Sequence, residues 1–479
     1  MTLVQDLGRW VAGFDASAIP ETAFDKAKQL VLDSLGCALG ALEEETPRSA
    51  LAAVRELGGH PDCTVIGTDI RTSAALAVLA NGVLVRALDL NDVGLGASGA
   101  CHPSDNIPVA LSLGERQDAS GRDVLAAIVM GYELYGRIHD LMRLDCPWDN
   151  VTGSSPVAAA MAGRLLRLAP EQLAHALALA MSHSHTLGVV RLGQLSAAKG
   201  LADAMVAHAA VLATLLAAQG ATGPETVFEG PRGMFQAALD KGGDKDGDKG
   251  GDKGRDKGGD NRGKSGDRAL TAPPAPHRLR IMEVGFKAYP CLASGQAAVA
   301  AALEVRSGLN DPLAQIKHIH ARMADTAFVR AQVNDRERDN PRSRETADHS
   351  FLYLVAVALL DGELTPAQFH EGRWFDPPVR ALMERTRIST DAALNGYTPG
   401  AFPCALEATL NDGRVISVTM PYPPGNAKNP LGWPGIEAKF HRYAGAVLSG
   451  ERRAAAVAAV KSMERLGSVR ELMRLIAAA

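Results

Sequence analysis

The segment AAKGLADAMVAHAAVLATLLAAQ, residues 197–219, predicts the fold class of this chain. It is mostly apolar, alanine is its commonest residue, and its length is typical of a helix rather than of a strand. Its longest apolar stretch, residues 205–218, is shorter than the roughly 20 residues that cross a bilayer and contains His208. We therefore expect a buried helix in a helical domain, and no membrane span.

The chain on the N-terminal side of this segment also has the apolar spacing of helices. In residues 21–44, for example, Ala23, Ala27, Leu30 and Val31 recur every three or four positions along the chain. Almost nothing before residue 238 alternates like a strand, so residues 1–238 predict a helical domain. Further helices are expected at 47–57, 73–88, 122–144, 155–167 and 170–183.

The stretch KGGDKDGDKGGDKGRDKGGDNRGKSGDR, residues 241–268, interrupts this pattern. It has no large apolar side chain, so it cannot bury enough surface to offset the entropy lost on ordering. We predict a disordered insertion over residues 239–270. Its aspartates alternate with its lysines and arginines and cancel their field, which argues against binding to nucleic acid.

After this insertion the sequence mixes helical and strand patterns. IKHIHARM, within residues 315–323, alternates like a strand, and residues 279–286 could form another. The tripeptide Asn411-Asp412-Gly413 lies between two apolar runs and predicts a β-hairpin. Helices are expected at 296–307, 349–360 and 377–385, so residues 271–425 predict an α+β domain.

Residues 426–479 return to helical spacing, and we expect them to pack back on residues 1–238. The predicted fold class is therefore mainly α with an α+β second domain. A large discontinuous all-helical domain would hold a smaller inserted α+β lid domain.

Composition excludes several classes of protein. The 50 Lys and Arg residues against 54 Asp and Glu give a net charge of −4, without the basic field that nucleic acid or an anionic membrane requires. The six cysteines stand alone, so neither a zinc ribbon nor an iron–sulfur motif is indicated, and a reduced, cytoplasmic protein is expected. Residues 1–14 have no apolar core of a signal peptide.

The densest polar cluster is ALDLNDVGLGASGACHPSDN, residues 87–106. Its glycines would let a tight loop bring Asp89 and His102 together, and a carboxylate with a histidine can form a general acid/base pair. Ser104 and Asp105 are equally typical of a helix cap, so a purely structural loop stays an alternative.

Three other segments carry candidate residues. Lys199 in AAKG would be a ligand-binding cation or a surface lysine, and Lys287 lies in the aromatic turn GFKAYPC at the domain junction. In RETADHS, residues 344–350, the polar side chains would cap a helix, or His349 would point into a cleft. His183 and His185 are two positions apart and point away from each other on a helix, so metal binding is not expected there.

Five motifs together resemble the MmgE/PrpD family, which includes 2-methylcitrate dehydratase, cis-aconitate decarboxylase and iminodisuccinate epimerase. They occur in order over nearly the whole chain outside residues 241–268. The motifs are LDLND and HPSDN within 88–106, AAKG at 197–200, FKAYP at 286–290, RETADHSFLYLVAVALLDGEL at 344–364, and YPPG, NP and KF within 422–440. The HPSDN and RETADHS forms are most similar to the 2-methylcitrate dehydratases.

The resemblance implies a homodimeric lyase without metal or other cofactor, whose active site lies between the two domains and takes a small di- or tricarboxylate. The catalytic positions it implies are Asp89, His102, Lys199 and Lys287. Substrate-binding residues are expected among Asn91, Asp92, Ser104, Asn150 and His349. His102 would move a proton with Asp89 as its partner, and the two lysines would bind substrate carboxylates.

Three positions depart from the decarboxylase pattern. Val93 stands where a threonine is expected, and Asn150 and Leu292 stand where histidines are expected. The sequence therefore favours a hydro-lyase similar to 2-methylcitrate dehydratase. A decarboxylase or epimerase acting on cis-aconitate or iminodisuccinate stays an alternative, as does a non-catalytic helical dimerisation protein.

Overall fold

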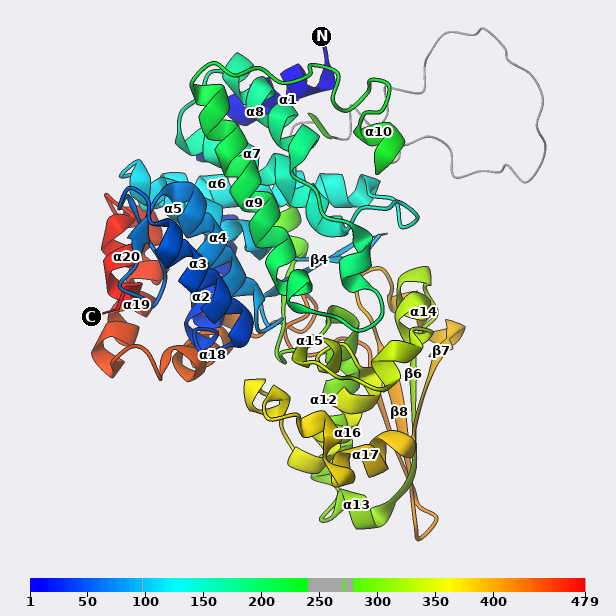
Figure 1. The fold of residues 1–479 in the computed structure, drawn as a ribbon. Helices are drawn as coiled ribbons and strands as arrows, with labels where there is room; N and C mark the ends of the chain where they lie inside the picture. The colour runs from blue at the N-terminus through cyan, green and yellow to red at the C-terminus, as the bar shows by residue number, and fades with distance from the viewer. Residues whose placement is uncertain (97, 240–269, 272–278, 479) are drawn as a thin grey trace, which may run out of the picture.

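The computed structural model describes residues 1–96, 98–239, 270–271 and 279–478. The chain forms a large helical part and a smaller α+β part, here called the lid (residues 287–425), which lie side by side (Figure 1). The predicted fold class, mainly α with an α+β second domain, is confirmed. Residues 240–269 of the predicted insertion 239–270 lie outside the described residues. The prediction is wrong at its two ends, because Leu239 and Leu270 are buried in the core.

Helix α9 (Ala197–Ala218) packs against α4 (Ala74–Arg86), α7 (Ser154–Leu165) and α8 (Pro170–His183). Gly82 allows the close approach of α4, since a Cβ there would lie 2.9 Å from the Cβ of Ala204. We expected the apolar stretch 205–218 to be too short to span a bilayer. That expectation is wrong, because α9, the helix that contains it, has 22 residues and is long and apolar enough to do so. However, 56% of its most apolar window is buried inside the protein, as the sequence predicted for a core helix.

The C-terminal helices complete the helical part, and Figure 1 shows them beside the N-terminal ones. Helix α18 (Gly432–Ala444) lies on α2 (Glu21–Gly40), where Gly36 leaves room for the backbone of Phe440. The helical part is therefore discontinuous in sequence. Its other helices are α1 (Leu3–Ala12), α3 (Glu45–Leu57), α5 (Ile107–Arg116), α6 (Gly121–Leu141), α10 (Met234–Ala237), α19 (Gly450–Lys461) and α20 (Arg470–Ile476).

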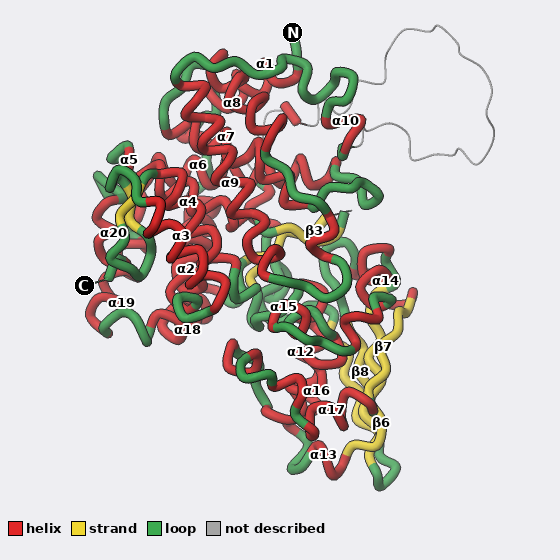
Figure 2. Tube along the Cα trace, viewed as in Figure 1, coloured by secondary structure: helices red, strands yellow, loops and turns green. Residues whose placement is uncertain are grey.

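The lid contains a four-stranded sheet in the order β7-β6-β8-β9. The predicted strand is β6 (Ile316–Ala324), and the predicted hairpin joins β8 (Cys404–Leu410) to β9 (Val415–Met420). Strand β7 (Thr386–Asp391), which pairs parallel to β6, was not predicted. Helices α12 (Gln296–Ser307), α16 (Phe351–Asp361) and α17 (Pro377–Glu384) lie along the sheet (Figure 2), with the shorter α13 (Pro312–Gln315), α14 (Ala327–Val333) and α15 (Arg344–Ala347) around them.

Short strands also occur in the helical part, where the sequence predicted almost none. The predicted loop 87–106 contains a hairpin of β3 (Asp92–Gly96) and β4 (Gly99–Cys101), and β3 pairs with β5 (Gly285–Phe286). Glycine-rich strands carry no alternating side-chain pattern, which is why periodicity did not reveal them. Of the strand predicted at 279–286, only β5 forms. Another short pair joins β1 (Cys63–Thr64) to β2 (Arg71–Thr72).

Candidate active site

Asp89 lies at the centre of a buried charged cluster, just after the end of α4. Its φ of +49° places it in the left-handed region, which aspartate tolerates better than most residues. Lys287 donates to the Asp89 carbonyl at 3.1 Å, and the Asp89 amide donates to the Arg86 carbonyl at 3.0 Å. These two bonds hold the backbone in the turn that directs the carboxylate into the cluster.

Three cations meet the Asp89 carboxylate: Arg86 from the end of α4, and Lys199 and Lys287 from distant parts of the chain. Arg86 Nη1 lies 2.5 Å and Lys287 Nζ 2.8 Å from Oδ1, and Lys199 Nζ lies 3.5 Å from Oδ2. All four side chains are almost fully buried. Burial alone would raise the pKa of Asp89, but the cations Lys199, Lys287 and Arg86 outweigh it and hold that pKa well below its usual value. Asp89, Lys199 and Lys287, three of the four residues predicted as catalytic, therefore lie together.

Burial also acts on the two lysines. It lowers the pKa of Lys199 to about 8, although Asp348 and Asp89 act in the opposite direction. It lowers the pKa of Lys287 as well, against the raising effect of Asp89. An ammonium group whose pKa lies near neutrality can bind an anion or exchange a proton at little cost.

Asn91, Asp92 and Ser104 hold the loop around Asp89. Asn91 accepts from Arg86 at 3.2 Å and donates to Ser104 and to the Asp105 carboxylate, at 2.9 and 2.7 Å. Asp92 accepts from the Ser104 hydroxyl at 2.6 Å and from Tyr132 at 2.8 Å. Burial raises the pKa of Asp92 to about 7, partly offset by these two hydrogen bonds. The predicted substrate-binding residues of this loop therefore bond chiefly to one another.

His102 is partly exposed at the end of β4. Its Nδ1 contacts the Asp92 carbonyl oxygen at 2.6 Å, and because a carbonyl only accepts, Nδ1 carries the proton and Nε2 is the free nitrogen. The sequence had suggested Asp89 as its partner, and the structure assigns that place to the Asp92 carbonyl. Burial, together with Arg86 and Lys287, lowers the pKa of His102 well below its usual value.

His349 enters the cluster from the lid, between α15 and α16. Its Nε2 lies 3.9 Å from Asp89 Oδ2, and its Nδ1 is hydrogen-bonded to the Asp348 carboxylate. Asp89, Asp348 and His349 offer ligand atoms within 4.8 Å of one another, a spacing that could hold a metal ion. Lys199 and Lys287 already face the Asp89 carboxylate, however, so this charge distribution favours an anionic ligand over a cation.

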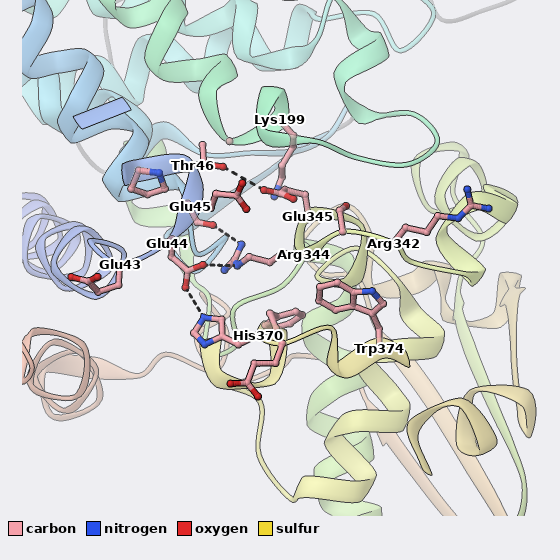
Figure 3. A pocket seen from close by; sticks show the side chains of 16 residues that line it. Glu43, Glu44, Glu45, Thr46, Lys199, Arg342, Arg344, Glu345, His370 and Trp374 are labelled. Atoms are coloured by element: carbon pink, nitrogen blue, oxygen red, sulfur yellow. Dashed lines mark hydrogen bonds and ion pairs between the residues drawn. The ribbon is translucent and has the colours of Figure 1, made fainter. Parts of the chain in front are cut away.

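A cleft of about 650 Å³ opens beside this cluster, between the start of α3 and the lid (Figure 3). Lys199 borders the cleft and thus connects it with the buried Asp89. Arg344 crosses the cleft from the lid, with its Nε 3.0 Å from Glu44 and its Nη1 3.4 Å from Asp348. His370 also reaches Glu44, at 3.2 Å. Charged residues therefore tie the two parts together where a ligand would enter.

The three positions that depart from the decarboxylase pattern have structural partners. Val93 and Leu292 are buried in the apolar core of the lid. Asn150 donates to the Ala100 carbonyl at 2.6 Å and so fixes β4. The first two positions therefore carry no group that can transfer a proton.

Arg86, Asp348 and Arg344 belong to the cluster but were not among the predicted site residues. Arg86 is the one charged residue in the apolar run AALAVLANGVLVR, a signal that could have drawn attention to it. Asp348 had been interpreted only as a helix-capping residue of RETADHS, and Arg344 had been given no role. Lys439 was also missed as a partner: it pairs with Asp33 at 2.6 Å and donates to the carbonyls of Leu90 and Lys287.

Comparison with known proteins gives one consistent picture. The MmgE/PrpD N-terminal domain matches residues 5–245, and the MmgE/PrpD C-terminal domain matches residues 289–465. Human cis-aconitate decarboxylase is 25% identical, covering 99% of this chain and 94% of its own length. The 2-methylcitrate dehydratases of Cupriavidus necator and Escherichia coli K12 are 27% and 26% identical, covering 87% and 91% of this chain and 85% and 89% of their own lengths.

Proposed function

This chain belongs to the MmgE/PrpD family, and from that premise we propose that it is a cofactor-independent hydro-lyase that dehydrates a small tricarboxylate, as 2-methylcitrate dehydratase does. The observation that carries the proposal is the buried Asp89 carboxylate with Lys199 and Lys287 within 3.5 Å of it. The cluster adjoins a cleft between two parts of the protein, the usual place for a small-molecule site.

The chemistry of dehydration requires what this cluster contains. Removing a proton next to a carboxylate places negative charge on that carboxylate, and preorganised cations in a dry site stabilise it. Lys199 and Arg344 border the cleft and would receive the substrate carboxylates. Lys287 holds Asp89 in place, and His102, whose tautomer is fixed by the Asp92 carbonyl, would transfer a proton.

The residues at two positions that differ from the decarboxylase pattern favour dehydration over decarboxylation. Val93 and Leu292 are apolar and lie in the lid core, so they supply neither the hydroxyl nor the imidazole of the decarboxylase pattern. Decarboxylation or epimerisation of a related polycarboxylate is the second candidate. Its support is the similarity to cis-aconitate decarboxylase over nearly the full length of both chains.

The test is an absorbance assay for the conjugated unsaturated acid, using 2-methylcitrate, citrate, cis-aconitate and iminodisuccinate as separate substrates. A hydro-lyase produces the conjugated band from one of the first two acids. Product analysis by NMR identifies release of CO₂ from cis-aconitate or inversion of iminodisuccinate. If all four acids stay unchanged and none raises the melting temperature, the protein is not an enzyme of this type.

Replacing Lys199 with methionine is expected to raise KM by about 10–100-fold, the equivalent of one lost charge-assisted contact. Lys287→Met removes a cation that does not border the cleft, so its larger effect should be on stability, through the loss of its bonds to Asp89. Steady-state kinetics and melting curves of both variants separate these effects. Lys428→Met, at an exposed lysine beside Tyr422, is the matched control. An unchanged KM in Lys199→Met would show that this lysine does not bind substrate.

A further inference from the structure

The Asp348–His349 pair has the geometry of an oriented imidazole. Asp348 caps the end of α15, its carbonyl accepts from the Leu292 amide at 3.0 Å, and its carboxylate accepts from His349 Nδ1. Ser350 caps the start of α16 directly after the pair. These contacts fix the ring, so that Nε2 faces Asp89 at 3.9 Å, too far for a hydrogen bond. Among the residues that the structure describes, Nε2 has no hydrogen-bond partner.

Asp348 is held in its charged form. Arg344 Nη1 lies 3.4 Å and Lys199 Nζ 3.8 Å from its carboxylate. Burial would raise the pKa of Asp348, but the charge of Lys199 and the hydrogen bond from His349 outweigh it and lower that pKa. A carboxylate only accepts, so His349 Nδ1 carries the ring proton and Nε2 keeps a free lone pair.

His349 is neutral in the free protein. Burial and Lys199 lower its pKa to about 3, although Asp348 and Asp89 act in the opposite direction. A bound polycarboxylate adds negative charge next to the ring and so favours the protonated form. When Nε2 takes a proton, the Asp348 carboxylate stabilises the imidazolium directly, as the aspartate does in a Ser-His-Asp triad.

His102 lacks this stabilisation. Its Nδ1 partner is the neutral carbonyl of Asp92, and the charges that lower its pKa are the cations Arg86 and Lys287. Both imidazoles present Nε2, but only His349 has a carboxylate on its other nitrogen among the described contacts. The two rings are therefore not equivalent as proton acceptors.

We propose that His349 accepts the carbon-bound proton of the substrate, with Asp348 as its positioning residue, and that His102 serves the leaving hydroxyl. This inference rests on the proposed function. The C–H bond next to a carboxylate breaks, its proton goes to His349 Nε2, and its electron pair forms the C=C bond. The C–O bond breaks with its electron pair on oxygen. His102 takes a proton from solvent once the bound substrate carboxylates offset the charges of Arg86 and Lys287, and it gives that proton to the oxygen so that water leaves. His349 then returns its proton to solvent.

The experiment follows solvent deuterium by NMR into the recovered acid, at the carbon next to the carboxylate, and measures elimination in parallel. The variants are His349→Asn and His102→Asn, because the asparagine amide can still donate where Nδ1 did. His349→Asn should lose both exchange and elimination by about 10²-fold or more. His102→Asn should lose elimination by a similar factor and keep exchange within about tenfold of wild type.

Asp348→Asn tests the positioning role. It should lower exchange by about tenfold or more, because the imidazolium loses its stabilisation. KM should change less than threefold, because Lys199 stays paired with Asp89 and Arg344 with Glu44. The double variant with His349→Asn should be no worse than His349→Asn alone, since the two residues act as one unit. Stabilisation by citrate in a melting experiment shows that each variant is folded, and His349→Gln replaces a variant that is not.

The outcomes separate this inference from the proposed function. If wild type exchanges and eliminates while His349→Asn exchanges at the wild-type rate, the assignment of His349 is wrong and the hydro-lyase stands. If Asp348→Asn changes KM alone, its positioning role is wrong. If wild type exchanges without eliminating, the epimerase replaces the hydro-lyase and the same comparison still decides the role of His349. If wild type does neither with any acid of the panel, the proposed function and this inference both fail.

Discussion

Asp89→Ala is expected to lower the free energy of unfolding by about 3–5 kcal/mol, the usual cost of removing one partner from a buried ion pair. Arg86, Lys199 and Lys287 would lose the carboxylate that they share, and water cannot replace it because all three are nearly fully buried. The variant also places alanine at a φ of +49°, which alanine adopts less readily than aspartate. The shift in urea-unfolding midpoint measures the loss.

The size of this loss should depend on pH. In the variant, the pKa of Lys199 falls further below its value of about 8, so the folded state binds fewer protons than the unfolded state over a wider range. The free energy of unfolding of the variant therefore rises with pH between 6 and 8. In wild type, the titration of Lys199 gives no such rise over this range. The difference from wild type should be largest near pH 6 and smaller near pH 8.

Two variants serve as controls for Asp89→Ala. Asp89→Asn keeps the size, an acceptor oxygen and tolerance of the left-handed backbone. The loss that the two variants share therefore measures the contribution of the negative charge. Asp412→Ala removes an exposed partner of Arg414 in the β8–β9 turn and should change stability by less than about 0.5 kcal/mol. If Asp89→Ala costs no more than Asp412→Ala, the charged cluster does not contribute to stability as described.

His102→Ala is expected to lower turnover by about 10²–10⁴-fold, the range for loss of a group that transfers a proton. The ring is partly exposed, and its one hydrogen bond to a described residue is to the Asp92 carbonyl, so the fold should persist. His102→Asn can restore that bond without restoring proton transfer. Turnover should stay low in both variants, while the melting temperature of His102→Asn should return toward wild type.

An exposed histidine provides the comparison for this loss. His60, whose side chain is 80% exposed, lies beside Asp62 in the helical part. His60→Ala should turn over at the wild-type rate. If His102→Ala keeps wild-type turnover in a folded protein, the loop 87–106 is structural, and the catalytic assignment of His102 is wrong.

The helices of the protein could be predicted because burial imposes a period on their sequences. In α18 the buried Ile436, Phe440 and Ala444 recur every four positions. Helices α4, α9 and α16 are buried on more than half of their residues and are instead nearly continuous in apolar residues. The β8–β9 hairpin was equally accessible, because its turn chemistry is local. The family could be recognised because its motifs occur in order along the chain, and the domain matches confirm it.

The β3–β4 hairpin could not be predicted in the same way. Its strands contain three glycines, which carry no side-chain alternation, and the partner of β3 is β5, about 190 residues farther along the chain. The partner of His102 was also misjudged. We expected the Asp89 carboxylate to be its partner, but the hairpin brings the Asp92 carbonyl to Nδ1 instead.

The sequence by itself determined the helical class, the inserted α+β lid, the family and the residue types of the site, because periodicity and motif order are properties of neighbouring positions. Only the tertiary structure decided which charges meet. Lys199, Lys287 and Asp348 reach Asp89 or its partners from three segments that are distant in sequence. The energy of a charge depends on distance and burial, which no local pattern records. For the same reason, the tertiary structure and not the sequence distinguished His349, paired with a carboxylate, from His102, paired with a carbonyl.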